Sequence, residues 1–205
     1  MSSRHLGLAI GGLVVFLLLL TSLGSAPQHA FDATLSVWLY DRRPALVSLA
    51  LLLGWSGSFW GSIPIAITAG WLLRRLGRIA WPGLPLLVLA SWCLNGVIKL
   101  LVHRPRPTLE HLMSVHGPSF PSGHAMAAMT LFGALGWLAC QRWPRQRVPI
   151  LALAALLVLA GGMARLVLGV HYGSDVLAAY GVGTVLLAAY FHIASHIASP
   201  TRLRA

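Results

Sequence analysis

The chain has 205 residues, 57% of them hydrophobic and only 9% charged, with a net charge of +11. A soluble globular domain carries about 25% charged residues, so this composition excludes a water-soluble domain and indicates a protein that lies in a lipid bilayer. The positive charge would suggest nucleic acid as the partner of a soluble protein, but here the basic residues stand in short clusters between long apolar stretches. We therefore expect a single membrane domain, residues 1–205, that does not bind nucleic acid.

Six apolar stretches predict membrane-spanning helices, because about 20 mostly apolar residues cross the hydrocarbon core of a bilayer. They are far longer than β-strands, so the expected fold class is all-α, a polytopic bundle of six transmembrane helices. The expected helices cover about 6–23, 45–73, 84–102, 121–140, 148–168 and 174–193. A shorter segment, 31–40, has the apolar spacing of a helix that lies on the outer membrane surface.

The first stretch also resembles a signal peptide, because Arg4 precedes the apolar core and small residues follow at 24–26. Cleavage after Ala26 would leave Pro27 at the new amino terminus, which signal peptidase disfavours. The apolar core is also long for a signal sequence. We therefore expect a retained membrane anchor.

The second stretch is interrupted by glycine and serine between Gly54 and Ser62. Its full length exceeds one span, whereas 59–73 alone is short. We interpret it as one helix entered through a half-buried segment, with Gly54, Gly57 and Gly61 allowing the break. Two short tilted helices are the alternative.

Basic residues predict the orientation, because Lys and Arg are more frequent on the cytoplasmic side of a membrane. One set of helix ends carries nine of them and the other set six, and all four acidic residues fall on the second side. The nine are Arg4, Arg74, Arg75, Arg78, Arg142, Arg145, Arg147, Arg202 and Arg204. We therefore expect both termini in the cytoplasm and an external loop at 103–120.

The first chemical cluster, Lys99-Leu-Leu-Val-His-Arg-Pro-Arg106-Pro107, begins near the outer end of the third expected helix. Its two Arg-Pro pairs predict an extended path, because proline restricts the residue before it. Arginine binds two phosphate oxygens at once, and lysine adds a mobile charge. The alternative is a basic helix end that only reaches toward lipid headgroups.

The second cluster, Ser119 to His124, opens the fourth expected helix. Pro121 fits the first helical turn, where its missing N–H costs nothing, and the free N–H groups of such a turn bind anions. Gly123 would let a phosphate approach the backbone, the Ser122 hydroxyl could donate to it, and His124 could protonate a leaving oxygen. The alternative is a helix cap with an incidental histidine.

The third cluster runs from Arg165 to Asp175 and joins the fifth and sixth expected helices. A carboxylate that accepts a hydrogen bond from one nitrogen of the His171 imidazole leaves the other nitrogen free as a nucleophile. The alternative is a turn held by a structural Arg165–Asp175 pair, with His171 merely at the interface.

Together the three clusters resemble the type 2 phosphatidic acid phosphatase family. Its pattern is Lys, six residues, Arg-Pro; then Pro-Ser-Gly-His; then Ser-Arg, five residues, His, three residues, Asp. The matching positions are Lys99 and Arg106-Pro107, then 121–124, then Arg165, His171 and Asp175. The resemblance implies a membrane lipid phosphatase of the haloperoxidase-like fold, with its motif-bearing core at about 81–196.

The resemblance also implies a role for each residue. His171 attacks phosphorus and becomes a phosphohistidine, Asp175 orients it, and His124 protonates the leaving group and later activates water. The phosphate oxygens are held by the remaining site residues, Lys99, Arg106, Ser122, Gly123 and Arg165. No metal and no other cofactor is implied. One departure is Ala164, which replaces the family's serine and removes a hydroxyl that we expect near the phosphate.

The implied substrate is a lipid phosphate. Undecaprenyl pyrophosphate is favoured over phosphatidylglycerol phosphate and phosphatidic acid, because the expected site faces the compartment where that lipid is released during wall synthesis. A phosphotransferase or lipid A phosphatase of the same fold is the main alternative. A transporter is a remote one, since the spans carry little polarity beyond Asn95. The expected location is the inner membrane of a bacterium, and the sequence leaves the oligomeric state open.

Other histidines and tryptophans are expected to lie at surfaces. We predict solvated or interfacial positions for His5, His29, His111 and His116, and for the pair His192 and His196 a membrane end rather than a metal site. The tryptophans mostly flank the expected spans, as an interfacial belt does; they are Trp38, Trp55, Trp60, Trp71, Trp81, Trp92, Trp137 and Trp143.

Overall fold

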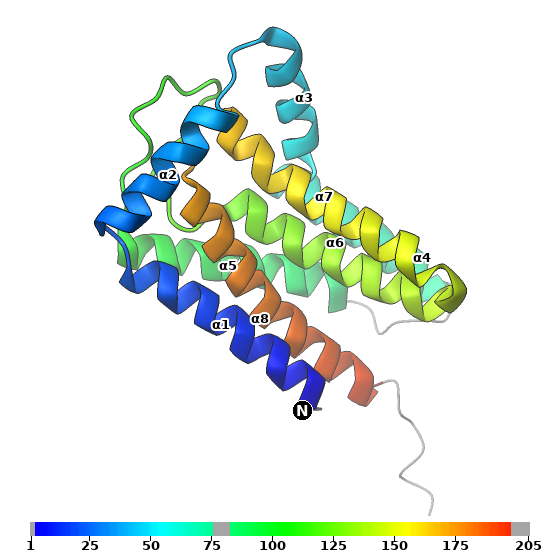
Figure 1. Ribbon diagram of the computed structural model, residues 1–205. Helices are drawn as coiled ribbons and strands as arrows, with labels where there is room; N and C mark the ends of the chain where they lie inside the picture. The colour runs from blue at the N-terminus through cyan, green and yellow to red at the C-terminus, as the bar shows by residue number, and fades with distance from the viewer. Residues whose placement is uncertain (1–2, 76–82, 198–205) are drawn as a thin grey trace, which may run out of the picture.

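The computed structural model describes residues 3–75 and 83–197, and in these ranges the chain is helical, with no strand. Figure 1 shows the helices packed side by side, with long connections at one end of the bundle. The α-helices are α1 (Ser3–Thr21), α2 (Ala26–Leu39), α3 (Pro44–Trp55), α4 (Phe59–Arg75), α5 (Gly83–Val102), α6 (Gly123–Arg142), α7 (Arg147–Val167) and α8 (Gly173–Ile197). A 3-10 turn, Pro144–Gln146, precedes α7.

The predicted all-α membrane bundle is confirmed. Five helical segments are each long and apolar enough to cross a membrane: α1, α5, α6, the 3-10 turn with α7, and α8. The sixth candidate is the pair α3 and α4, which passes the same test together but bends by 46° between Trp55 and Phe59. The second expected stretch therefore forms two helices, the alternative in the sequence analysis, and they meet inside the glycine-rich stretch where the sequence predicted an interruption.

Glycines allow the break between α3 and α4 to lie in close contact with the start of α6. A Cβ atom on Gly57 would lie 2.7 Å from the backbone oxygen of His124, and one on Gly61 would collide with the backbone oxygen of Trp55. Gly54 lies within α3, and a Cβ there would collide with the guanidinium of Arg165. The broken span thus reaches two residues of the expected site, because these positions carry no side chain.

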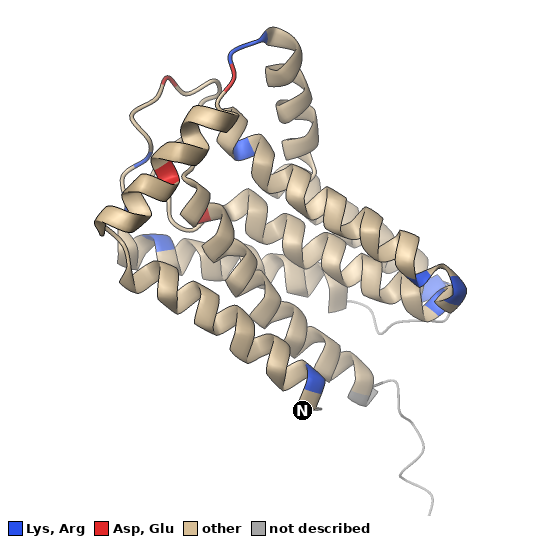
Figure 2. Ribbon diagram, in the orientation of Figure 1, with Lys and Arg blue, Asp and Glu red and all other residues tan. Residues whose placement is uncertain are grey.

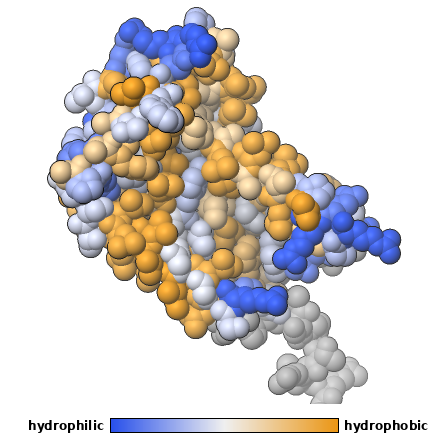
Figure 3. All heavy atoms as spheres, viewed as in Figure 1, coloured by the Kyte–Doolittle hydropathy of each residue, from blue (hydrophilic) through white to orange (hydrophobic). Residues whose placement is uncertain are grey.

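Two helices form the centre of the bundle. In α6 and α8, 56% and 50% of the membrane-crossing window is buried, against 6% in α1. Ala125, Ala127, Ala128 and Ala134 of α6 have no exposed surface, and such small side chains let neighbouring helices approach closely in a membrane. Much of the face drawn in Figure 3 is apolar, as a surface in contact with lipid tails should be.

The start of α6 differs from the expectation. Pro121 is not in the first turn: α6 begins at Gly123, and Ser122 is its N-cap, with extended backbone and a hydroxyl that accepts from the Ala125 N–H. The Phe120–Pro121 peptide bond is cis. The prediction was wrong because a capping serine places the proline one residue ahead of the cap and outside the helix.

The helix expected at 31–40 is confirmed as α2, which begins five residues earlier, and its place on the outer membrane surface stays a prediction. Helix α2 packs against α7 and α8, buries Gln28 and Asp32, and leaves Val37 81% and Trp38 79% exposed. Exposed apolar residues opposite a buried polar face suit a helix at the membrane surface.

Charge is distributed unequally between the two ends of the bundle. Figure 2 shows the Asp and Glu residues gathered near α2 and the long connections, while a group of basic residues lies at the opposite end, near the start of α7. Four positions from the sequence analysis, Arg78, Trp81, Arg202 and Arg204, lie outside the described residues. The side chain of His196 is likewise outside what the structure describes.

Helices α1 and α8 touch through backbone atoms. A Cβ atom on Gly12 would lie 2.6 Å from the Gly181 oxygen, and one on Gly181 would lie 2.7 Å from the Gly12 oxygen. Gly11, the neighbouring residue, would meet nothing within 4 Å. The pair offers a matched test of this helix contact.

We predict that Gly12→Ala destabilises the protein, because its methyl group forces α1 away from α8. Overpacking of this kind costs about 1–3 kcal/mol of unfolding free energy, whereas Gly11→Ala should be neutral or stabilising by up to about 1 kcal/mol. Thermal unfolding of both variants in detergent measures the difference. Equal transition temperatures for the two would contradict the packing described here.

Candidate active site

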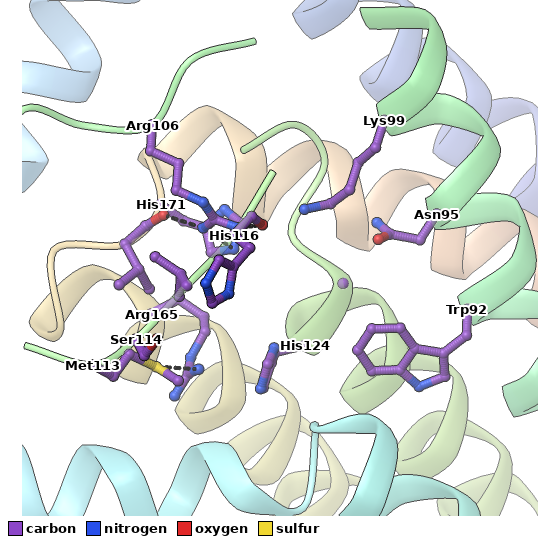
Figure 4. A pocket seen from close by; sticks show the side chains of 13 residues that line it. Trp92, Asn95, Lys99, Arg106, Met113, Ser114, His116, His124, Arg165 and His171 are labelled. Carbon is purple, nitrogen blue, oxygen red and sulfur yellow. Dashed lines mark hydrogen bonds between the residues drawn. The ribbon is translucent and has the colours of Figure 1, made fainter. Parts of the chain in front are cut away.

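The three sequence clusters meet around one cavity of about 290 Å³ at the end of the bundle where the long connections lie. Figure 4 shows side chains from α5, α6, α7 and two connecting segments pointing into it. Six of the eight predicted site residues line the cavity: Lys99, Arg106, Gly123, His124, Arg165 and His171. The two histidines therefore share one chamber, as the proposed chemistry requires.

His171 stands in the turn between α7 and α8, backed by the carboxylate of Asp175. The His171 Nδ1 and Asp175 Oδ2 atoms are 3.3 Å apart, and the Tyr172 N–H donates to the same oxygen at 3.0 Å. An ionised carboxylate only accepts, so Nδ1 carries the proton and the lone pair lies on Nε2. That second nitrogen is 3.5 Å from Arg106 Nη1, beside the cation on the cavity wall.

Burial keeps the His171 imidazole neutral. Its side chain is 5% exposed, and this burial lowers the pKa of His171 to about 4, although hydrogen bonding to Asp175 works in the opposite direction. An imidazole with this pKa is unprotonated at neutral pH. It therefore has the free lone pair that a nucleophile needs.

His124 enters the cavity from the first turn of α6. Its ring packs against Trp92 in a T-shaped arrangement, with ring centroids 6.1 Å apart, and Figure 4 shows it between Arg165 and Trp92, below His171 in this view. Two contacts fix the position of His124. Ser122 caps α6, and the backbone of His124 lies against Gly57 in the break between α3 and α4. A group bound in the cavity would lie between the two imidazoles.

Three cations line the same cavity, and none of them has a carboxylate partner among the described residues. Lys99 Nζ donates to the Pro118 oxygen at 2.6 Å, and Arg106 donates to the backbone oxygens of Gly117 at 3.0 Å and Val170 at 2.8 Å. These acceptors are neutral, and burial lowers the pKa of the Arg106 guanidinium. In the described ranges no salt bridge involves Lys99, Arg106 or Arg165.

Arg165 is the most buried of the three. It is 2% exposed, its Nη1 lies 3.2 Å from the sulfur of Met113, and its Nε has no hydrogen-bond partner among the described residues. A buried cation with an unused donor is costly unless an anion joins it. The alternative interpretation of an Arg165–Asp175 pair is wrong, because Asp175 pairs with Arg104 instead.

Two predicted contacts are absent from the cavity wall. Ser122 is fully buried, and its hydroxyl accepts from the Ala125 N–H as the cap of α6, so it does not reach the cavity as predicted. Ala164 packs in an apolar cluster with Ala50, Leu168 and Val170. Ala164 itself does not line the cavity, and the effect of the missing hydroxyl stays a prediction.

Sequence reasoning missed several cavity residues. Trp92 and Asn95 line the cavity, and Asn95 Nδ2 donates to the Pro121 oxygen at 3.0 Å. A Cβ atom on Gly123 would lie 2.8 Å from the Trp92 ring and 2.9 Å from Asn95 Oδ1, so glycine makes room for both. Their spacing to Lys99 (i, i+3, i+7) places all three on one helix face, a signal that could have found them.

The loop before α6 also contributes to the wall. His116, expected at a solvated or interfacial position, is exposed but lines the cavity together with Met113, Ser114 and Val115. Its backbone oxygen accepts from Arg106 Nη2 at 3.1 Å. The cations of the site thus hold this loop over the cavity.

The described residues contain no group of three or more His, Cys, Asp or Glu side chains that could hold a metal ion. The charged groups that line the cavity are the cations Lys99, Arg106 and Arg165, which suit an anion. The absence of a metal requirement stays a prediction from the sequence.

Comparison with known proteins places this site in context. Residues 83–197 match the PAP2 superfamily. Phosphatidylglycerophosphatase B of Bacillus subtilis is 28% identical over 169 residues, 79% of this chain and 82% of the relative. Lipid A 1-phosphatase of Rhizobium etli is 33% identical over 182 residues, 73% of this chain and 75% of the relative.

A solved structure shares the fold. The crystal structure of a transmembrane PAP2 type phosphatidylglycerolphosphate phosphatase from Bacillus subtilis aligns with a TM-score of 0.81 at 23% sequence identity. The alignment covers 95% of this chain and 98% of that chain. The arrangement of the helices around the cavity is therefore that of a known membrane fold.

We predict that inorganic phosphate binds this cavity and raises the unfolding temperature, because it would compensate the three unpaired cations. A ligand at 100 times its dissociation constant stabilises a protein by about 2.7 kcal/mol. Arg165→Gln should remove most of the shift in a thermal titration. Arg43→Gln is the matched control, since Arg43 is exposed and pairs with Asp41; a shift lost equally in both variants would contradict binding at this cavity.

Proposed function

The chain belongs to the PAP2 superfamily, and we propose that this membrane lipid phosphatase works through a phosphohistidine at His171. The observation that carries the proposal is the cavity itself, which is lined by two imidazoles and by three cations that have no carboxylate partner among the described residues. A phosphate group supplies the negative charge that these cations lack. Its phosphorus would lie between a nucleophile and a proton donor.

In the first step, Nε2 of His171 attacks phosphorus while the bond to the leaving oxygen breaks. Lys99, Arg106 and Arg165 stabilise the three equatorial oxygens, and Asp175 stabilises the positive charge that develops on the His171 ring. His124 gives its proton to the leaving oxygen, so the product lipid departs neutral at that atom. A bound phosphate dianion beside His124 favours the protonated imidazole that this step needs.

In the second step, water attacks the phosphohistidine. His124 now accepts a proton from that water, the N–P bond breaks, and inorganic phosphate leaves with His171 restored. Phosphoryl transfer depends mostly on positioning and charge stabilisation. The cations of the cavity supply both, so the proposal includes no metal ion.

The proposed substrates are lipids that carry a terminal phosphate or pyrophosphate. Phosphatidylglycerol phosphate is supported by the name of the Bacillus subtilis relative, and a lipid A 1-phosphate by that of the Rhizobium etli relative. Undecaprenyl pyrophosphate is favoured by the expected outward orientation of the site. All three present a phosphate at the membrane surface, where the cavity would receive it.

The proposed orientation places the cavity outside the cytoplasm and both termini within it, in the inner membrane of a bacterium. The basic residues near the end of α4 and the start of α7 lie away from the cavity (Figure 2). Basic residues favour the cytoplasmic side of a membrane. This distribution supports a site that faces the periplasm.

We predict that the purified protein, in detergent with EDTA, releases phosphate from lipid phosphates, and that His171→Ala removes nearly all of this activity. Removing a nucleophile that works together with its base costs up to about a million-fold in kcat. A panel of the three lipids ranks the substrates, and ³²P-labelled lipid followed by alkaline gel analysis detects the phosphohistidine. Unchanged turnover by folded His171→Ala would overturn the mechanism; label recovered in a second lipid would identify a phosphotransferase.

We predict that His124→Ala slows hydrolysis in a way that depends on the leaving group. General acid catalysis contributes about 10²–10⁴-fold, and a substrate such as p-nitrophenyl phosphate needs little of it, because its leaving oxygen is weakly basic. The measurement compares kcat for this substrate and for an alkyl lipid phosphate in the variant and the parent protein. An equal loss for both would contradict the role of His124 as the acid.

A further inference from the structure

A second charged cluster lies behind the nucleophile, away from the cavity. Arg104 Nη1 donates to Asp175 Oδ1 at 2.6 Å, and its Nη2 donates to Asp32 Oδ2 at 2.7 Å. The side chains are 9% exposed for Arg104, 2% for Asp32 and 0% for Asp175. One guanidinium therefore joins two buried carboxylates, one of which backs His171.

Ser174 closes the cluster on its far side. Its N–H donates to Asp32 Oδ1 at 2.9 Å and its hydroxyl donates to Asp32 Oδ2 at 2.7 Å. Arg104 Nη1 also donates to this hydroxyl at 2.7 Å. Asp32 belongs to α2, and Ser174 belongs to the first turn of α8, 142 residues further along the chain. The cluster therefore joins α2 to the start of α8, next to His171 and Asp175.

The Tyr172 ring packs against the face of the Arg104 guanidinium. Its carbon lies 4.1 Å from the centre of the Tyr172 ring, within the range of a cation–π contact. Tyr172 is the residue after the nucleophile, and its N–H donates to Asp175 Oδ2. In the described ranges, the hydrogen-bond and ring partners of the Arg104 guanidinium thus belong to the segment 171–175 or to Asp32, which anchors it.

The two oxygens of Asp175 have separate partners. Oδ1 accepts from Arg104, whereas Oδ2 accepts from the Tyr172 N–H and faces His171 Nδ1. Without Arg104 the carboxylate would lose the partner that fixes its rotation, and it would share a buried site with the like charge of Asp32. With Arg104 the cluster carries one net negative charge behind an imidazole that becomes positive during the reaction.

We propose that Arg104, anchored by Asp32, is a positioning residue that fixes the Asp175 carboxylate against His171 Nδ1 and so sets the direction of Nε2 toward phosphorus. The inference rests on the proposed function, because it assigns these residues to the same nucleophile. Neither Arg104 nor Asp32 lines the cavity, so they act through Asp175 and not through the substrate.

The contacts of Arg104 with two carboxylates require the planar guanidinium group of arginine. Two different nitrogens of one guanidinium reach two carboxylates at once, whereas a lysine ammonium is a single charge on a flexible stem. Arg104→Lys keeps the charge and loses the fork. Asp32→Asn keeps the shape and removes the anchoring charge.

We expect Asp32→Asn and Arg104→Lys each to lower kcat on a lipid phosphate by about 10- to 100-fold, the usual effect of losing a group that orients a functional residue. The KM should stay within about twofold of the parent value, because no contact with substrate changes. Arg43→Gln, which breaks an exposed ion pair on the same side of the bundle, should change neither constant. Parental kcat in both cluster variants would overturn the proposal.

A double variant separates positioning from structural support. Arg104→Gln alone leaves two buried carboxylates facing each other and should lower the unfolding temperature. Adding Asp32→Asn removes one of these charges, and replacing both partners of a buried pair restores much of the stability. Recovered thermal stability with kcat still at least about 10-fold low supports the proposal; kcat that recovers together with stability would overturn it.

Parallel assays of the parent protein keep the two proposals distinct. A parent protein that releases no phosphate from any lipid, or forms no label on His171, would fail the proposed function. An active parent that forms phosphohistidine, beside cluster variants of unchanged kcat, would fail only the positioning role of Arg104.

Discussion

The buried residue Asp175 is the point at which the separate motifs of this protein are joined. Its carboxylate accepts from Arg104 and from the Tyr172 N–H and faces His171, while its backbone oxygen accepts from the Ser122 N–H at 3.1 Å, at the cap of α6. One residue therefore links the nucleophile, the helix start that carries His124 and the Arg-Pro segment. Moving Asp175 would displace both imidazoles together.

Positive and negative charges are separated on the two sides of His171. Lys99, Arg106 and Arg165 face the cavity, and their acceptors within the described part of the chain are neutral, while both buried carboxylates pair with Arg104. Because Arg104 holds Asp32 and Asp175 behind the ring, neither carboxylate forms a salt bridge with the cavity cations. The separation leaves their charge available to a phosphate and keeps an anion behind the imidazole that becomes positive.

The sequence by itself determined the fold class, the membrane spans and the family. The length of the apolar stretches predicts the spans, since in lipid a helix satisfies its backbone hydrogen bonds within one segment. The glycines at 54, 57 and 61 predicted an interruption in the second stretch. The motif spacing also identified the cavity side chains of Lys99, Arg106, His124, Arg165 and His171. A functional pair that lies within one short segment, such as His171 and Asp175, can be predicted from the spacing of its residues along the chain.

Only the tertiary structure decided which distant residues meet. Asp32 stood in the sequence as an acid of a surface helix, and its partners Arg104 and Ser174 are 72 and 142 residues away. Ser122 was expected at the phosphate but caps α6, and Ala164 packs in an apolar cluster with Ala50, Leu168 and Val170. The physical reason is that a polar side chain takes whichever partner the packing of helices brings within hydrogen-bond distance, and a linear pattern gives its spacing along the chain but not its neighbours across it.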